Sequence, residues 1–200
     1  MRIKGFTLAE VLITLGVIGI VAALTIPPLI SNYKKRSVGA KLARFYSTMN
    51  QALLMAKVEN GSLEFNQIDL NDSEYLNQWY KNYVTKYIKT ISETVPNSAY
   101  YKAIFIDGSG FNSYFSGRKP DGEPGLNNLY IFYCIDYSSC INGRYDGKNS
   151  FLFILKPEQA MMLTYPGTTC EKDDLERRWG CATIIKQNNW KIPDDYPIKF

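Results

Sequence analysis

The feature that most constrains this chain is a long apolar stretch close to its start. From Phe6 to Ile30 the sequence runs for 25 residues with one ionisable side chain, that of Glu10. About 20 apolar residues in a helix cross the hydrocarbon core of a bilayer, which is about 30 Å thick. The stretch is therefore long enough to span a membrane. A carboxylate at the centre of such a helix costs about 2.5–3.5 kcal/mol on insertion scales, so Glu10 is expected to have a partner and a role.

The residues around Glu10 form a specific motif. Residues 4–10 read Lys-Gly-Phe-Thr-Leu-Ala-Glu and lead directly into the apolar stretch. This segment resembles the processing signal of type IV prepilins and type II secretion pseudopilins. The resemblance implies that a membrane peptidase cuts after Gly5 and that Phe6 becomes the N-methylated first residue. It also implies that Glu10 neutralises the Phe6 amine of a neighbouring subunit during assembly, since the stretch itself contains no Lys, Arg or His.

Two other kinds of N-terminal segment are alternatives. A secretory signal peptide has an apolar core of about 7–15 residues followed by a small-residue cleavage site, whereas this stretch is longer and ends at Pro27-Pro28. A plain membrane anchor is the second alternative. The two prolines are expected to kink the helix, or to end it at Ile26 with a restart near Tyr33, because proline removes a helical hydrogen bond and crowds the preceding turn.

Four cysteines, all in the last third of the chain, indicate a disulfide framework. An even number of cysteines is typical of exported domains, and short loops close at the least entropic cost. Cys134–Cys140 and Cys170–Cys181 are therefore the favoured pairs, with free buried thiols as the alternative. A zinc site is not favoured, because the C-x-x-C spacing and histidine are both absent from the sequence.

Charge and composition narrow the classes of function. The sequence has 23 basic and 19 acidic residues and no histidine, and removal of residues 1–5 takes away Arg2 and Lys4 and leaves a net charge of +2. Without histidine the commonest general base and the commonest metal ligand are missing. Residues 34–36, Lys-Lys-Arg, form the only basic cluster, and they are expected at the membrane surface. The sequence therefore argues against an enzyme and shows no clear nucleic-acid site.

The orientation of the chain in the membrane rests on the cysteines and the processing motif. Basic residues lie on both sides of the apolar stretch, at positions 2 and 4 and again at 34–36, so the positive-inside rule gives nearly equal weight to the two orientations. Disulfides form in oxidising compartments outside the cytoplasm. The domain after the stretch is accordingly expected to be extracytoplasmic.

The N-terminal part is predicted to be one long helix. Apolar residues recur at three- and four-residue steps over 33–57, as in an amphipathic helix with one buried face. Together with the transmembrane and assembly part, 6–30, this predicts a helix over 6–57 that ends near Asn60-Gly61. The first half has no polar face and must lie in lipid or among other helices.

The remainder, 58–200, is predicted to be a globular domain with disulfide-closed loops. A second apolar stripe predicts a helix over 73–93. Strands are predicted at 102–107, 129–136 and 150–155, with further edge or extended pieces at 182–185 and 190–193. The expected fold class is α+β and pilin-like: a long N-terminal helix packed on a domain with a second helix and an antiparallel sheet.

Two loops are candidates for binding. In the loop 136–149, side-chain oxygens recur at Asp136, Asn142, Asp146 and Asn149. This pattern is loosely similar to the calcium-binding loop of major pseudopilins, but Arg144 places a cation among the oxygens and ordinary turn residues explain the same pattern. No cofactor or metal ligand is therefore assigned, and Ca²⁺ in this loop stays an alternative. The charged residues between Cys170 and Cys181 are interpreted as a solvated face, and the resemblance implies an exposed loop that contacts partners.

The resemblance implies a structural subunit of a type IV pilus-like or type II secretion pseudopilus filament, and not an enzyme. Its expected partners are other pilins in a homo- or hetero-oligomeric filament, the prepilin peptidase and the inner-membrane assembly machinery. The subunit is expected to cross the cytoplasmic (inner) membrane once and to reach the periplasm or cell surface on assembly. The alternatives are a membrane-tethered extracytoplasmic binding domain and a minor pilin for DNA uptake or adhesion.

Overall fold

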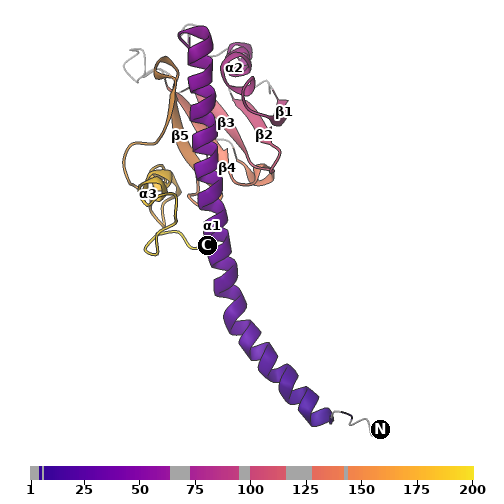
Figure 1. The fold of residues 1–200 in the computed structure, drawn as a ribbon. Helices are drawn as coiled ribbons and strands as arrows, with labels where there is room; N and C mark the ends of the chain where they lie inside the picture. The colour runs from indigo at the N-terminus through magenta and orange to yellow at the C-terminus, as the bar shows by residue number, and fades with distance from the viewer. Residues whose placement is uncertain (1–4, 6, 64–72, 95–99, 116–127, 142–143) are drawn as a thin grey trace.

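A computed structural model describes residues 5, 7–63, 73–94, 100–115, 128–141 and 144–200. Its dominant element is helix α1, Leu8–Asn60, whose 53 residues run without a break from the apolar stretch into the domain. Figure 1 shows the first half of α1 projecting alone and the second half lying across the sheet. The helix ends where the sequence indicated, because Gly61 has a φ of 76° and its N–H donates to the carbonyl of Lys57.

The second half of α1 buries one face against the domain. Phe45 lies at the centre of this face, where its ring stacks on that of Tyr133 with the centroids 4.1 Å apart. The ring of Phe153 meets it edge-on at 5.4 Å. The spacing of the buried positions is that of the predicted amphipathic helix. The buried residues of α1 are Val38, Gly39, Leu42, Phe45, Met49, Ala52, Leu53 and Ala56.

The second helix is shorter than predicted. Helix α2, Ser73–Tyr80, continues as a π-helical turn, Lys81–Thr85, and the chain then enters strand β1, Thr90–Thr94. The prediction of a helix over 73–93 is therefore wrong in its last third. Helical spacing of apolar side chains persists to Ile91, but this segment is rich in β-branched residues and pairs with the next strand, and that pairing decides its conformation.

Six strands of the described chain form one antiparallel sheet, in which each strand pairs with the next along the chain. Strand β4 lies in the middle and pairs along its whole length with β3 and β5. The strands are β1 Thr90–Thr94, β2 Tyr101–Phe105, β3 Gly110–Phe115, β4 Leu129–Cys134, β5 Ser150–Lys156 and β6 Met161–Thr164. The architecture is the α+β, pilin-like arrangement that the sequence predicted.

Three strands lie where the sequence predicted strands. Two further segments, predicted to be extended, are not strands in the structure. Strands β2, β4 and β5 match the predictions at 102–107, 129–136 and 150–155 to within two residues at each end. The piece predicted as extended at 182–185 is instead helical, because it lies inside helix α3, Cys181–Gln187. The piece at 190–193 has no regular secondary structure. The described chain also contains short 3₁₀ turns at Tyr137–Ser139, Pro157–Gln159 and Leu175–Arg177.

Candidate functional site

The start of α1 is closed by a capping box. The Thr7 hydroxyl accepts a hydrogen bond from the backbone N–H of Glu10, at 3.2 Å. In return, the Glu10 carboxylate accepts from the Thr7 backbone N–H at 2.9 Å and from the Thr7 hydroxyl at 2.8 Å. Two otherwise unpaired N–H groups at the helix start are satisfied in this way. Gly5 is exposed beside this box, whereas Phe6 lies outside the described residues.

The capping box gives Glu10 a partner that the sequence analysis missed. No Lys, Arg or His lies between Phe6 and Ile30, so the partner is not a charged side chain of the same stretch. The signal was present all the same, since Thr-x-x-Glu before an apolar run is the sequence pattern of a capping box. Glu10 therefore helps to cap the start of α1 within its own chain. Any pairing with a neighbouring subunit has to be compatible with this arrangement.

The apolar half of α1 is exposed along its whole length. The helix from Leu8 to Ile30 is about 35 Å long at 1.5 Å per residue, which exceeds the hydrocarbon thickness of a bilayer. Its most apolar window of 18 residues has a mean hydropathy of 2.3, and none of that window is buried. The exposed large apolar side chains here are Leu8, Val11, Leu12, Ile13, Leu15, Val17, Ile18, Ile20, Val21, Leu24, Ile26, Leu29 and Ile30.

The two prolines lie inside α1 and do not end it. Pro27 and Pro28 fall within the continuous helix, so the alternative of a stop at Ile26 is wrong. Each proline lacks the N–H that would bond to the carbonyl four residues earlier, so two backbone hydrogen bonds of the helix are missing here. Figure 1 shows the exposed half of α1 curving away from the axis of the packed half.

The four cysteines form two disulfides, Cys134–Cys140 and Cys170–Cys181. These are the two pairs favoured from loop length. Cys170 and Cys181 belong to the hydrophobic core, and Cys181 is the first residue of α3. The second disulfide therefore holds the start of α3 against the core.

In the loop 136–149 the described carboxylates, those of Asp136 and Asp146, accept hydrogen bonds from backbone N–H groups two to four residues later in the chain. Asp136 accepts from the backbone N–H of Ser138 at 3.0 Å. Asp146 accepts from the backbone N–H groups that follow it in the chain, those of Lys148, Asn149 and Ser150, at 2.6–2.9 Å. The side-chain amide of Asn149, a third candidate, donates to the Asp146 carboxylate at 3.0 Å. Asn142, the fourth, lies outside the described residues. Among the residues that the structure describes, no three His, Cys, Asp or Glu side chains form a group that could hold a metal ion.

Asp146→Asn is expected to destabilise the fold by about 1–3 kcal/mol at neutral pH, because the amide accepts these hydrogen bonds less strongly than a carboxylate. Burial alone would raise the pKa of the Asp146 carboxyl, but the hydrogen bonds from Lys148, Ser150 and Asn149 outweigh it and hold the pKa below its ordinary value of 3.8. The stabilisation is therefore complete above pH 3.8 and is lost as the pH falls through the lowered pKa.

This prediction is checked by urea unfolding of both chains at a series of pH values. The difference in unfolding free energy between wild type and Asp146→Asn should shrink as the solution is acidified below pH 3.8. Asp194→Asn, at an exposed aspartate, serves as the control and should change the free energy little. A difference between wild type and Asp146→Asn that stays constant with pH would show that the charge of Asp146 is unimportant.

Hydrogen bonds from Arg178 stabilise the charged loop between Cys170 and Cys181. The Arg178 guanidinium donates to three backbone carbonyls: that of Glu171 at 2.8 Å, that of Lys172, and that of Asp146 at 2.9 Å. A salt bridge of 3.1 Å joins Arg177 to Glu171. The interpretation of this loop as a merely solvated face therefore missed the structural role of Arg178.

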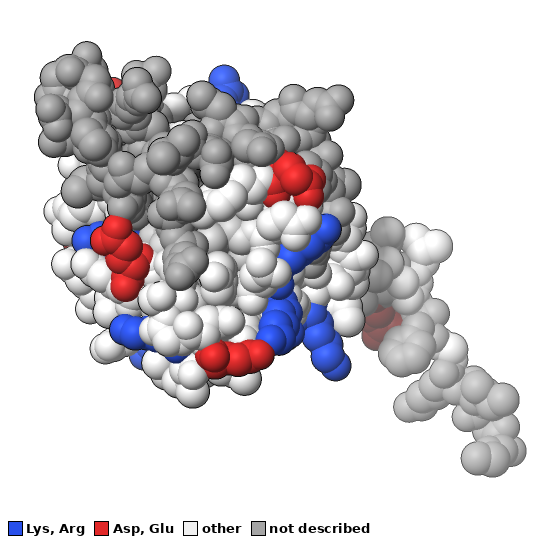
Figure 2. All heavy atoms as spheres, turned by 90° about the horizontal axis from the view of Figure 1, so that it is seen from above, with Lys and Arg blue, Asp and Glu red and all other residues white. Residues whose placement is uncertain are grey.

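Charge on the end of the domain opposite the apolar half of α1 is mixed. Figure 2 shows this end from above, with basic and acidic side chains interspersed among uncharged ones over its described part. Binding through the phosphates of a nucleic acid needs several cations together. On the described part of this face, several basic side chains lie side by side with acidic side chains at both ends of the row.

The capping box, the exposed apolar half of α1 and the sheet packed on its other half define a pilin-type precursor. Residues 1–26 match the model described as "Prokaryotic N-terminal methylation motif", which supports a type IV prepilin-type signal. The chain belongs to the family described as "Family of unknown function (DUF6613)", whose model matches residues 28–164 and 146–200. No curated protein and no solved structure matches the chain.

Proposed function

We propose that this protein is a structural subunit of a type IV pilus-like or type II secretion pseudopilus filament. The prepilin peptidase removes residues 1–5, and mature subunits assemble through the apolar half of α1. The observation that supports this best is that the exposed apolar half of α1 carries Glu10 in its first turn, five residues past Gly5. A plain anchor needs apolar length but no acid.

The energetics of the exposed half favour assembly over a free-standing domain. Thirteen large apolar side chains lie exposed from Leu8 to Ile30. At about 1.5–3 kcal/mol each, covering them is worth on the order of 20–40 kcal/mol. They must therefore be covered by lipid or by protein at every stage. A subunit can leave the membrane only by exchanging lipid for the equivalent helices of other subunits.

The capping box is compatible with a bond between subunits. A carboxylate offers about four lone-pair sites, and Thr7 uses one oxygen of Glu10, Oε2. Glu10 can therefore hold its own helix start and still accept a hydrogen bond from the Phe6 amine of a neighbour. In this proposal the pairing sets the register of one subunit against the next.

Before assembly the subunit is held in the cytoplasmic membrane with its domain outside the cytoplasm. The two disulfides support this orientation, because disulfides persist in oxidising compartments and are rare in the cytosol. The filament then carries the domain into the periplasm or to the cell surface.

Mass spectrometry of the native protein tests the processing step. The chain should begin at Phe6 and carry one added methyl group on its amine. A Gly5→Leu variant should keep residues 1–5, because the cleavage site is altered. A native chain that begins at Met1 would overturn the proposal and favour the alternative of a membrane-tethered binding domain.

A pair of variants at Glu10 separates its charge from its role in helix capping. Glu10→Ala removes both, whereas Glu10→Gln removes the charge and keeps a side chain that can complete a capping box. Both variants should still insert into the membrane, and both should reduce the filament yield at least about tenfold, since close charge pairs contribute about 1.5 kcal/mol or more. The measurement is the amount of sheared or pelleted filament at equal subunit levels. Normal filaments from Glu10→Gln would falsify the charge-pairing role.

A further inference from the structure

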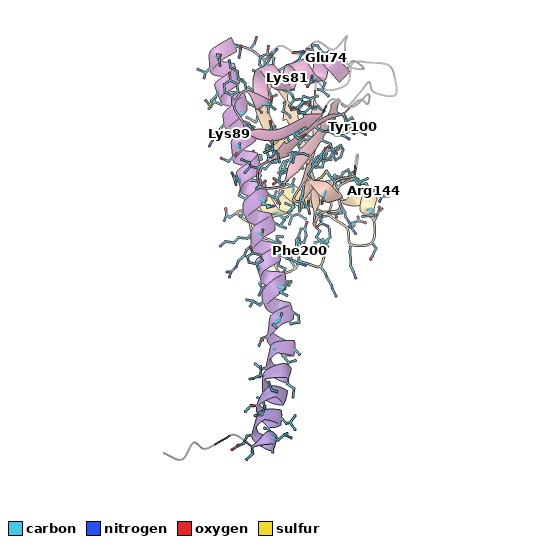
Figure 3. All side chains as sticks on the ribbon, turned by 90° about the vertical axis from the view of Figure 1, so that its right-hand side faces the viewer. Glu74, Lys81, Lys89, Tyr100, Arg144 and Phe200 are labelled. Carbon is cyan, nitrogen blue, oxygen red and sulfur yellow. A yellow bond between two sulfur atoms is a disulfide. The ribbon has the colours of Figure 1, made fainter. Side chains whose placement is uncertain are left out.

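The described chain contains a hollow at the end of the domain nearest the apolar half of α1. This basal hollow has a volume of about 770 Å³. The C-terminus marks the same end of the domain. Figures 1 and 3 show the C-terminus and Phe200 beside α1 there, and a main-chain oxygen of Phe200 accepts from the Ser31 hydroxyl at 3.3 Å. The basal hollow is lined by Asn32, Lys35, Arg36, Gly39, Ala40, Ala43, Asn189, Trp190, Lys191, Ile192 and Asp194.

One wall of the basal hollow is the segment 188–192, which lies very close to α1. A Cβ atom at Gly39 would lie 2.1 Å from the Trp190 carbonyl oxygen, so the absence of a side chain permits this approach. The Trp190 ring packs on that of Tyr46 with the centroids 5.2 Å apart, and its backbone N–H donates to the Ile185 carbonyl at 2.8 Å. The wall is therefore fixed by contacts with both α1 and α3.

The charge of the basal hollow is mainly positive. It is lined by the basic side chains of Lys35, Arg36 and Lys191 and by the acidic side chain of Asp194. Within the described ranges, the structure records no ion pair for any of these three basic side chains. Asn32 and Asn189 add amide donors to the lining. The basal hollow thus offers several donors and an excess of positive charge to an anion.

The lower part of the basal hollow, at Asn32, Lys35 and Arg36, lies at the height of the lipid headgroups. Asn32 and Arg36 lie about 3 and 9 Å past Ile30 along the helix axis, at 1.5 Å per residue. The headgroup layer extends about 5–8 Å beyond each side of the hydrocarbon core.

We propose that the basal hollow binds the phosphate of an anionic phospholipid headgroup, with Lys35 and Arg36 of α1 and Lys191 of the segment 188–192 as the binding cations. Basic pockets at the end of a membrane helix are suited to anionic headgroups. The proposal rests on α1 spanning a membrane, as in the proposed function. It does not depend on filament formation. The bound lipid would fix the height and tilt of the domain on the membrane before assembly.

The test measures lipid binding to the full chain in detergent by native mass spectrometry. The probes are dihexanoyl-phosphatidylglycerol, dihexanoyl-phosphatidylcholine and inorganic phosphate. The phosphatidylglycerol should bind one molecule per chain, at least about tenfold more tightly than either of the other two. Equal binding of the two lipids would overturn the proposal. Inorganic phosphate bound as tightly as phosphatidylglycerol would assign the basal hollow to free phosphate and would overturn it equally.

Matched variants distinguish a site from diffuse attraction between charges. Lys35→Gln should weaken phosphatidylglycerol binding about fivefold, whereas Lys34→Gln, at a neighbouring cation outside the lining, should change it less than about twofold. Equal losses from the two variants would show that no site exists. Lys57→Gln with Lys81→Gln, at the far end of the domain, should leave binding unchanged. Carbonate extraction of each variant reports membrane anchoring separately, so a failure of lipid binding and a failure of the proposed function are told apart.

Discussion

Replacing Phe45 by alanine is expected to lower the free energy of unfolding by about 3–5 kcal/mol, the range for a large aromatic side chain deleted from a core. The side chain is 4% exposed. It joins α1 to four strands, because its ring contacts Tyr133 of β4 and Phe153 of β5 and lies 5.8–6.0 Å from Phe111 of β3 and Phe105 of β2. No other described side chain of α1 has ring contacts recorded with as many strands.

The measurement is urea unfolding of the full chain in detergent, with wild type and variant compared at the same pH. Val58→Ala is the matched control, since Val58 lies on the same helix and is 80% exposed. Its change should stay within about 0.5 kcal/mol. Phe45→Leu should fall between the two, because it keeps much of the buried volume. A loss below about 1 kcal/mol for Phe45→Ala would mean that the cluster around this ring contributes little to holding α1 on the sheet.

The parts of the fold that the sequence predicted well are those set by local pattern. The apolar stretch and the stripe over 33–57 fix α1, since each face of a helix repeats every three to four residues. The pairing of the cysteines followed from loop length. Strands β4 and β5 are continuous runs of apolar and aromatic residues, as expected for strands buried in the middle of a sheet.

The parts that the sequence did not predict depend on partners distant in the chain. The segment 182–185 is rich in β-branched residues, yet it is helical because its first turn is anchored by the Cys170–Cys181 disulfide and its side chains pack into the core. Strand β1 has a helical apolar pattern and takes its conformation from β2. The role of Arg178 requires carbonyls from two separate loops. None of these contacts has a signature within a short window of sequence.

The basal hollow could not be predicted from local sequence either, because its walls come from distant parts of the chain. The sequence shows residues 34–36 as a basic cluster and predicts that they lie at the membrane surface. The other wall of the hollow, with Trp190 and Lys191, comes from a segment about 150 residues later. Gly39 gave no signal in the sequence, because a glycine inside a helix usually only lowers helix propensity. Its function here is to admit the Trp190 backbone.

Removing the Cys170–Cys181 disulfide is expected to lower the free energy of unfolding by about 2–4 kcal/mol. Loop closure alone gives about 3 kcal/mol for a loop of about 15 residues, and this loop has a sequence separation of 11. The loss of packing adds to this, because Cys170 and Cys181 are 8% and 0% exposed and belong to the core. The backbone nearby is tightly packed, since a Cβ at Gly180 would lie 2.6 Å from the Thr169 nitrogen.

The experiment compares Cys170→Ala/Cys181→Ala with Cys134→Ala/Cys140→Ala by urea unfolding in detergent. The second pair should lose less, for two reasons. Its sequence separation is 6, which lowers the loop-closure contribution by about 0.5 kcal/mol. Its Cys140 is also only half-buried, whereas Cys170 and Cys181 are both buried. Exchange of the Ile184 and Ile185 amides should accelerate in the first variant only, because that disulfide holds the start of α3. A larger loss from the Cys134–Cys140 pair would show that the loop after β4, and not the start of α3, is the part of the domain that depends on a disulfide.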